Sequence, residues 1–264
     1  MKFCIKPPVL MFAAALLISV CTGLPAQGND SVRFKMYTLK KSFPSGTKKS
    51  SVDLAFKIVA CSRPGPVQAL VQKILYNGRS PEEYGKLLTA DWKNEFIAFT
   101  KDDPEYEQSW TYTEEHRLVL KGNYAVISQG ISYYRGGAHP NWLENNYILD
   151  TEAVRQLQRG DIIPQRNISA LKDLVDRKLR VVSEEKTGES LPPGTPLSGG
   201  IYFEDAVDLS EDFYPTEKGL SFQWDPYEIT PYAVGGVEIT LSWQELENFL
   251  SPEGKKLAAA FAPK

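Results

Sequence analysis

Cysteine is scarce in this sequence, with three residues in a chain of 264. Cys4 and Cys21 lie in a segment that we expect to be removed, which leaves Cys61 alone. A single cysteine cannot form an intrachain disulfide, so disulfide bonds do not hold this fold together. Cys61 ends a strand-like run with no histidine or basic cluster beside it, so we interpret it as a small strand residue rather than a reactive thiol.

Histidine is scarcer still, since His116 and His139 are the only two. The chain contains no Gly-x-Ser-x-Gly motif or other local nucleophile signature. A zinc site usually needs more ligands than these two histidines and Cys61 provide at their spacing. We therefore assign no catalytic residue, no metal and no cofactor, and we interpret His116 as an exposed strand residue.

The chain also lacks an excess of basic residues. It has 30 Lys and Arg against 33 Asp and Glu, a net charge of −3, and loss of Lys2 and Lys6 with the expected leader brings this to −5. This mild acidity argues against nucleic-acid binding, which requires a basic face. There is no fixed-period repeat and no long low-complexity tract, so the chain suits one large domain or two small ones.

Residues 1–26 have the pattern of an export signal. Lys2 and Lys6 form a basic start, Val9–Val20 is an apolar run, and Leu24-Pro25-Ala26 offers small residues for cleavage. The run is shorter than the roughly 20 residues that span a membrane, and no basic stop follows it, which argues against the alternative of a retained anchor helix. We predict export to the periplasm, the cell envelope or the extracellular space.

Cys21 offers a second processing route. A cysteine at the end of a signal can become the lipidated first residue of a bacterial lipoprotein, although Val20 before it is a poor match to that signal. Cleavage after Ala26 and lipidation at Cys21 with a lipid anchor are therefore both open.

Alternating polarity predicts a hairpin at the start of the mature chain. Ser31–Leu39 and Val52–Ala60 have the two-residue period of strands, with a polar turn over Lys40–Ser50. Helical spacing follows over Val67–Leu75.

A second helix is predicted from Pro81, because Ser80 and Glu83 form a capping box. Its apolar stripe, which we expect to face the core, consists of Tyr84, Leu87, Leu88, Trp92 and Phe96.

The rest of the chain also mixes strands and helices. Trp110–Leu120 and Tyr124–Tyr134 flank a glycine turn and predict a hairpin. We expect a connector over Asp150–Pro164, a helix over Ile168–Val182, an exposed loop over Lys186–Gly200 and a fraying end over Ala258–Lys264. Further strands are expected at Tyr202–Val207, Phe213-Tyr214, Leu220–Trp224 and Val237–Leu241, and a last helix after Ser242.

This clustering of elements predicts an α+β fold with a largely antiparallel sheet. We divide the chain into a leader over 1–26, a smaller N-terminal region over 27–105 and a larger C-terminal domain over 106–264.

Two blocks in the C-terminal domain stand out. The first lies between two strand-like runs and contains Tyr134, Gly136, Gly137, Ala138, His139, Pro140, Asn141 and Trp142. The second contains Asp225, Pro226, Tyr227, Glu228 and Tyr232. The glycines permit positive φ and close approach of another segment, while the prolines restrict the second block to turns. Its tyrosines either anchor the loop on the core or contribute to a groove.

With Gly219-Leu220-Ser221-Phe222, these blocks resemble the RsiV-like extracytoplasmic domain over roughly residues 110–245. That family includes the outer domain of the anti-sigma factor RsiV and the accessory region of the peptidoglycan deacetylase PdaC. The resemblance implies one α+β domain in which the two loops lie close together. RsiV binds lysozyme through this domain. This sequence departs from the family pattern because no transmembrane helix or sigma-binding segment precedes the domain and no deacetylase domain accompanies it, so we expect neither sigma-factor control nor deacetylase activity.

These observations leave several functional hypotheses. The first is an exported, non-enzymatic binding protein whose paired loops engage an envelope protein such as a muramidase, or a peptidoglycan fragment. The second is an envelope polysaccharide hydrolase or deacetylase that uses His139 with Glu228 or Asp225. A third is an assembly or structural factor without a small ligand. We interpret His139 chiefly as a loop-structuring side chain that bonds to backbone.

Overall fold

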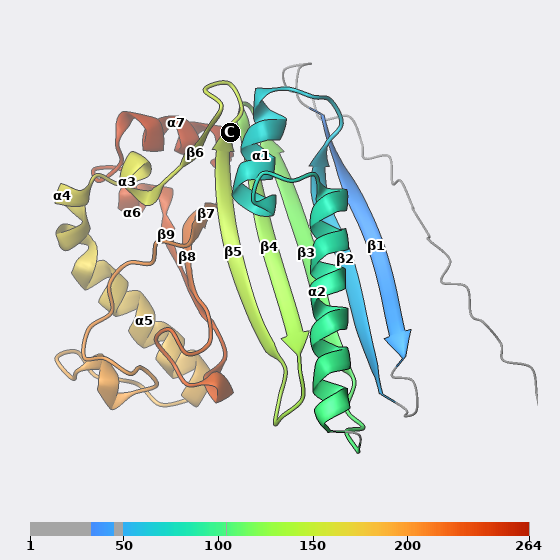
Figure 1. Ribbon diagram of the computed structural model, residues 1–264. Coiled ribbons are helices and arrows are strands. Elements are labelled where there is room, and N and C mark those ends of the chain that lie inside the picture. Colours follow the sequence, from blue (N-terminus) through green and yellow to red (C-terminus); the bar gives the residue numbers. More distant parts are fainter. Residues whose placement is uncertain (1–32, 45–49, 104, 264) are drawn as a thin grey trace, which may run out of the picture.

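The computed structural model describes residues 33–44, 50–103 and 105–263 and shows an α+β protein built on two sheets (Figure 1). The predicted export signal and Cys21 lie outside these residues. None of the helices in the described ranges is long and apolar enough to cross a membrane.

The larger sheet has six strands in sequence order and holds the molecule together. All neighbours pair antiparallel except β2 and β3, which are parallel. A parallel pair needs a crossover connection, and two helices supply it: α1 (Pro66–Tyr76) and α2 (Pro81–Asp102). The strands are β1 (Phe34–Pro44), β2 (Ser51–Cys61), β3 (Trp110–Lys121), β4 (Tyr124–Tyr134), β5 (Asn141–Asp150) and β6 (Arg155–Leu157).

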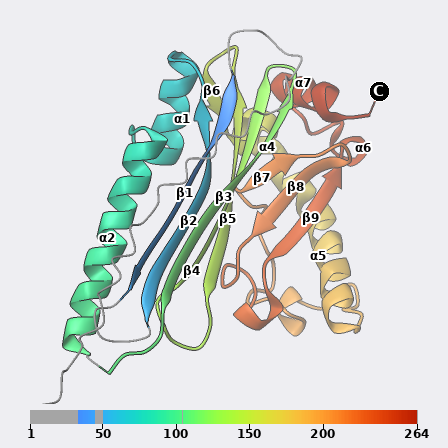
Figure 2. The same cartoon turned by 90° about the vertical axis from the view of Figure 1, so that its right-hand side faces the viewer.

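Helices α1 and α2 cover one face of this sheet and form an N-terminal core with it (Figure 2). The expected capping box of α2 is present, with the Glu83 N–H donating to Ser80 Oγ at 3.1 Å. Trp92 and Phe96 are buried in this core as predicted. Leu87 was expected to join them but is exposed, because it lies off the side of the helix that contacts the sheet.

A C-terminal layer packs on the other face, next to β4 and β5 (Figures 1 and 2). Its antiparallel sheet consists of β7 (Phe213–Pro215), β8 (Gly219–Trp224) and β9 (Val237–Ser242). Its helices are α3 (Arg159–Ile162), α4 (Gln165–Ile168), α5 (Lys172–Thr187), α6 (Trp243–Leu246) and α7 (Pro252–Phe261), with short 3-10 turns at Ser169–Leu171, Leu197–Gly199 and Tyr232–Val234. Strands from both predicted regions share the six-stranded sheet.

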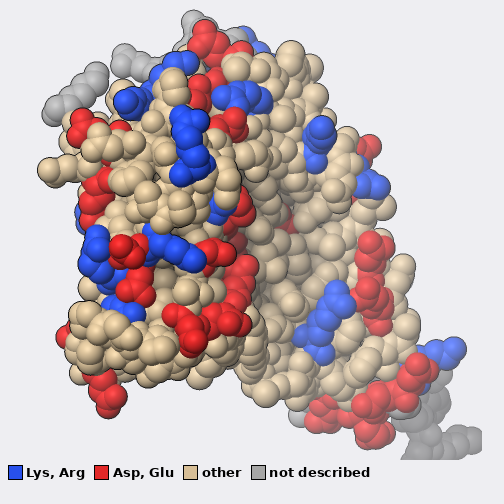
Figure 3. All heavy atoms as spheres, turned by 90° about the vertical axis from the view of Figure 1, so that its left-hand side faces the viewer, with Lys and Arg blue, Asp and Glu red and all other residues tan. Residues whose placement is uncertain are grey.

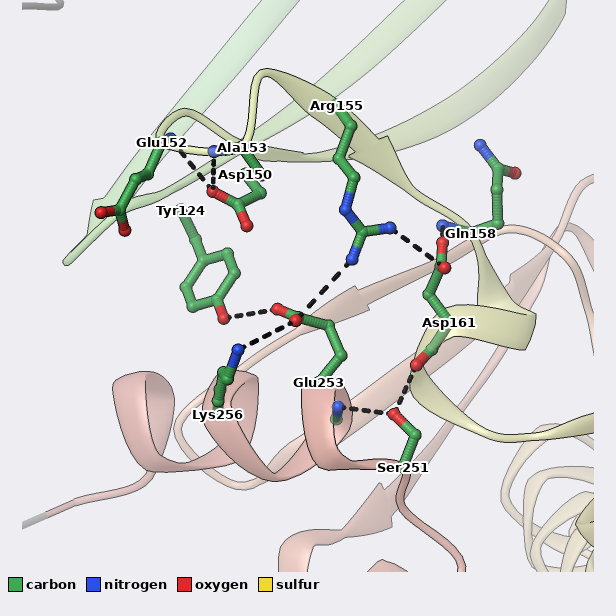
Figure 4. A network of polar contacts seen from close by, with 11 residues as sticks. Tyr124, Asp150, Glu152, Ala153, Arg155, Gln158, Asp161, Ser251, Glu253 and Lys256 are labelled. Atoms are coloured by element: carbon green, nitrogen blue, oxygen red, sulfur yellow. Dashed lines mark hydrogen bonds and ion pairs between the residues drawn. The ribbon is translucent and has the colours of Figure 1, made fainter.

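Polar contacts fix the last helix, α7, to the end of the large sheet (Figure 4). Tyr124 on β4 donates to Glu253 Oε1 at 2.8 Å. Ser251 caps α7 by accepting from the Gly254 N–H at 2.9 Å and itself donates to the Asp161 carbonyl. The predicted fraying from Ala258 is wrong through Phe261, which is buried in the C-terminal core.

Several other expected boundaries differ from the structure. Lys40–Pro44 was predicted as turn but continues β1, paired with β2 as far as Ser51. Tyr202–Val207 was predicted as a strand but has an irregular backbone. Tyr202 and Val207 are nevertheless buried in the C-terminal core, which explains the apolar pattern of this segment. The glycine- and proline-rich loop over Lys186–Gly200 is not wholly exposed, since Leu191 and Leu197 insert into the same core. The predicted connector over Asp150–Pro164 contains β6 and α3.

His116 was predicted to be exposed, and this is wrong: its side chain is fully buried between the large sheet and the N-terminal helices. The Val59 N–H donates to His116 Nδ1 at 3.2 Å, so the ring proton lies on Nε2 and donates to Glu114 Oε1 at 2.9 Å. Gln129, Tyr84 and Tyr112 donate to the same carboxylate at 2.7, 2.8 and 2.9 Å. Burial opposes the charge on Glu114, but the hydrogen bonds from His116 and Gln129 hold the pKa of this carboxyl below its usual range.

Candidate binding site

The first candidate loop, residues 135–140, joins β4 to β5 and adopts a backbone that requires glycine. Gly136 has φ +90° and Gly137 has φ +104°, in the left-handed region that side chains avoid. At Gly136 a Cβ would also lie 2.3 Å from the hydroxyl oxygen of Tyr106. The positive φ that glycine permits is therefore present at both residues, and the close approach is present at Gly136.

One side of this loop is fastened to the N-terminal layer. The Arg135 guanidinium lies 4.3 Å from the centre of the Trp92 ring and pairs with Glu95 at 2.8 Å. The Tyr106 hydroxyl donates to the Arg135 carbonyl at 3.3 Å. Gln108 Oε1 accepts from the Gly137 N–H at 3.2 Å. These contacts fix the direction in which the chain leaves β4.

The other side of the loop is fastened to the C-terminal layer by an aromatic stack. The His139 and Tyr232 rings lie 3.7 Å apart and nearly parallel, at 14°. Tyr232 donates its hydroxyl proton to the Pro140 carbonyl at 2.6 Å, and His139 Nδ1 lies 2.9 Å from the same oxygen. The two loops thus lie side by side, and His139 bonds to backbone as predicted.

Tyr227 extends this stack into solvent. Its ring centre lies 5.7 Å from that of Tyr232, and the residue is 58% exposed. Its backbone has φ 74°, a strained position for a residue other than glycine. Tyr227 therefore does not anchor its loop on the core, whereas Tyr232 anchors one loop on the other.

Trp142 is a further partly exposed aromatic residue of the first block. It is 37% exposed on β5, and a Cβ added to Gly236 would lie 2.6 Å from its ring. Gly236 therefore leaves room for this indole, which sits between the second loop and the face of the large sheet.

Two carboxylates bind the exposed edge of β5. Asp225 accepts from the Glu144 N–H through both oxygens, at 3.0 and 3.1 Å. Asp212, which lies beside Gln223 on β8, accepts from the Asn146 N–H at 2.8 Å. Backbone N–H groups two residues apart point the same way along a strand, so the pair of carboxylates replaces a neighbouring strand.

Burial disfavours the ionisation of both carboxylates. Burial, and then the charges of neighbouring acids, raise the pKa of Asp212 and that of Asp225 each to about 6. Glu144, which pairs with Arg117, contributes to both shifts. In Figure 3, acidic side chains gather along the hollow that separates the C-terminal layer from the large sheet.

The remaining predicted residues have plain structural positions. Tyr134 donates to the Gly137 carbonyl at 2.9 Å, and Glu228 accepts from the Asp225 N–H at 2.8 Å. Ala138 is exposed, Asn141 is the first residue of β5, and Pro226 is half-buried in its turn. Sequence reasoning missed Glu144 and Asp212, because no motif marks a partner of the Asp225 loop so far away along the chain.

His139 and Asp225 both make hydrogen bonds to backbone groups within the fold. In the ranges that the structure describes, the hydrogen-bonding partner of His139 is the Pro140 carbonyl, and Asp225 is directed to the β5 backbone. The same ranges contain no cluster of three or more His, Cys, Asp or Glu side chains arranged to hold a metal ion. What the site offers a ligand is exposed aromatic surface bordered by carboxylates.

Together these features define a class: an α+β protein in which a mixed six-stranded sheet carries helices on one face and a smaller antiparallel sheet on the other. Residues 160–244, which form most of the C-terminal layer, match the family described as a protein of unknown function, DUF3298. The likeness to that family therefore concerns the C-terminal layer, and the match does not extend to β1–β5. No functionally curated protein matches the chain.

Two solved structures share the fold. A DUF3298 family member from Bacteroides fragilis has 20% identity and a TM-score of 0.71, with 87% of this chain and 98% of that chain covered. A DUF3298 family protein from Pseudomonas aeruginosa has 12% identity and a TM-score of 0.56, with 89% and 99% covered. Both therefore support the architecture of nearly the whole described chain.

Proposed function

We propose that this chain is an exported, non-enzymatic binding protein of the cell envelope that engages its ligand through the two paired loops. The observation that carries this proposal is Tyr227. A large aromatic side chain is held at positive φ and left mostly in solvent, although a glycine would relieve the strain and burial would stabilise the fold. Strain of this kind at an exposed aromatic is characteristic of a binding surface.

The surroundings of Tyr227 favour a cationic protein or a glycan as the ligand. Tyr232 and His139 continue its stack, while Glu228 and Asp225 add carboxylates beside it. The resemblance to the RsiV-like family adds an envelope setting and makes a cationic muramidase, or a peptidoglycan fragment, the first ligand to test. A carboxylate-bordered surface attracts such a protein by charge complementarity.

The test is binding of the purified mature protein to a cationic muramidase and to soluble peptidoglycan fragments, measured by calorimetry. Tyr227→Ala should weaken binding by about tenfold, or about 1.4 kcal/mol, which is typical of a tyrosine that anchors an interface. Tyr227→Phe keeps the ring and should bind like the wild type. Muramidase binding should also weaken as salt concentration rises.

Ile97→Ala is the matched control, since Ile97 is 53% exposed and lies on α2, whereas the paired loops follow β4 and β8. It should leave binding unchanged. If the wild-type protein binds neither ligand, or if Tyr227→Ala and Ile97→Ala behave alike, the proposed function is wrong.

A further inference from the structure

The face of β1, β2 and β3 that points away from the helices forms an open surface of small polar side chains. The N-terminal helices contact the opposite face of these strands, and the C-terminal core includes residues of β4 and β5 but none of β1 to β3 (Figure 2). Thr111 and Thr113 on β3 are exposed there, as is Ser132 on β4. Among the described residues, this surface is thus left without a covering layer.

The strand registers place five of its residues in a single row across the sheet. Cross-strand partners point to the same face, so the row is continuous from strand to strand. Neighbouring strands lie about 4.8 Å apart, which makes the row roughly 19 Å long. From edge to edge it consists of Lys40, Ala55, Thr113, Ser132 and Trp142.

A hollow of about 480 Å³ lies over one half of this row, lined by Lys40, Ala55 and Thr113 and by neighbours that include Asp53 and Thr111. This volume is in the range of sites for small organic ligands. The row ends at the partly exposed indole of Trp142, which reaches the paired loops through its contact with Gly236.

The charges on this face cancel one another. Lys57 pairs with Glu115 at 2.6 Å, and Arg117 pairs with Glu144. Asp53 keeps its charge, since its hydrogen bond at 2.6 Å comes from the neutral Ser51 hydroxyl, and Lys40 in the same hollow carries the opposite charge. A polyanion or a polycation would need a surface with an excess of charge of one sign. The ion pairs leave no such excess of charge over the middle of the row.

The backbone of the central strands is also fully engaged. β2, β3 and β4 each pair with a strand on both sides, so an extended peptide cannot add to them as a further strand. A hydroxyl-lined floor and a terminal aromatic ring instead match a ligand that has many hydroxyls and alternating apolar faces.

We propose that this row binds an uncharged glycan chain, with the sugar units crossing the strands over Ala55, Thr113 and Ser132 and the last unit stacking on Trp142. The inference rests on the binding function proposed above, to which it adds the class of ligand and its path. Hydroxyls of the floor exchange hydrogen bonds with sugar hydroxyls, and the indole covers the apolar face of a ring.

The test is calorimetry with neutral chito-oligosaccharides and cello-oligosaccharides of increasing length. Affinity should rise with length until the row is covered and should change little with salt. Thr113→Arg places a long side chain in the centre of the floor and should weaken binding by about tenfold or more. Ser132→Arg, on the next strand, should do the same.

Val119→Arg is the matched control, because Val119 lies on the same face of β3, is 47% exposed and is six residues beyond Thr113. All three variants should keep the wild-type unfolding temperature. Oligosaccharide binding that is equal in Thr113→Arg and Val119→Arg, or that is lost only in Tyr227→Ala, overturns the row as the site.

The two proposals fail separately. If a cationic muramidase binds through Tyr227 and no neutral oligosaccharide binds, the glycan row is wrong and the proposed function stands. A preference for peptides or for charged polymers over neutral sugars also overturns the row. If no ligand of any kind binds, both proposals are wrong.

Discussion

At the scale of single residues, the loop from Arg135 to Pro140 contains glycines that are required for different reasons: a positive φ, and a lack of space for a side chain. Gly136 and Gly137 both have positive φ, but only Gly136 is in close contact, against Tyr106. The Tyr106 hydroxyl also accepts from Trp110 Nε1 at 3.0 Å, so its displacement would disturb the fastening of the loop to the N-terminal layer.

We predict that Gly137→Ala costs about 1 kcal/mol of unfolding free energy, from backbone strain alone. Gly136→Ala should cost about 2–3 kcal/mol, because the strain is joined by loss of the Tyr106 hydrogen bonds. Urea denaturation of the two variants measures the difference. Equal destabilisation would show that Tyr106 moves aside without loss.

At the scale of secondary-structure elements, a buried carboxylate joins α2 to β3 and β4. Glu114 accepts from four side chains, which come from three elements: Tyr84 on α2, Tyr112 and His116 on β3, and Gln129 on β4. A buried charge is tolerated when every lone pair has a donor, and such a network fixes the relative positions of its elements.

We predict that Glu114→Gln destabilises the protein by about 2–4 kcal/mol, since an amide presents donors to groups that are themselves donors. Tyr84→Phe removes one donor of four and should cost about 1 kcal/mol. Guanidinium unfolding compares them. The network would be unimportant for stability if both variants unfolded at the wild-type denaturant concentration.

At the scale of the whole molecule, the two layers meet at the β5 edge, where Asp212 and Asp225 accept from backbone N–H groups. A carboxyl whose pKa is raised in the folded state binds a proton more tightly there than in the unfolded chain. Its contribution to stability is therefore fully present below its unfolded value, near 3.8, and is lost as pH rises toward about 6.

We predict that Asp212→Asn matches the wild type near pH 4 and is more stable than it by about 1–2 kcal/mol above pH 6.5, after allowance for solvent screening. The amide keeps an acceptor for the Asn146 N–H while removing the charge. Unfolding free energies measured across this pH range give the difference.

Asp212→Ala is the companion variant, because it removes both the charge and the acceptor. It should be less stable than Asp212→Asn by about 1–3 kcal/mol at every pH, since the Asn146 N–H loses its partner. A pH-independent difference between Asp212→Asn and the wild type would contradict the raised pKa.

The sequence alone determined the local features of this fold. Periodicity and turn residues predicted most strands, and the Ser80–Glu83 capping box predicted the start of α2. The glycines at 136 and 137 predicted the positive φ of their loop. These features depend on backbone sterics and on neighbours a few residues away, which a single sequence contains in full.

Only the tertiary structure decided which surfaces were covered. The alternation of β3 assigned His116 to one face but could not show that α1, α2 and Glu114 enclose that face. In the same way, no local pattern joins Asp225 to Glu144, 81 residues away, or aligns Lys40 with Trp142 across five strands. The periodicity of a strand determines the face of the sheet to which a side chain points, whereas long-range packing determines which residues cover that face.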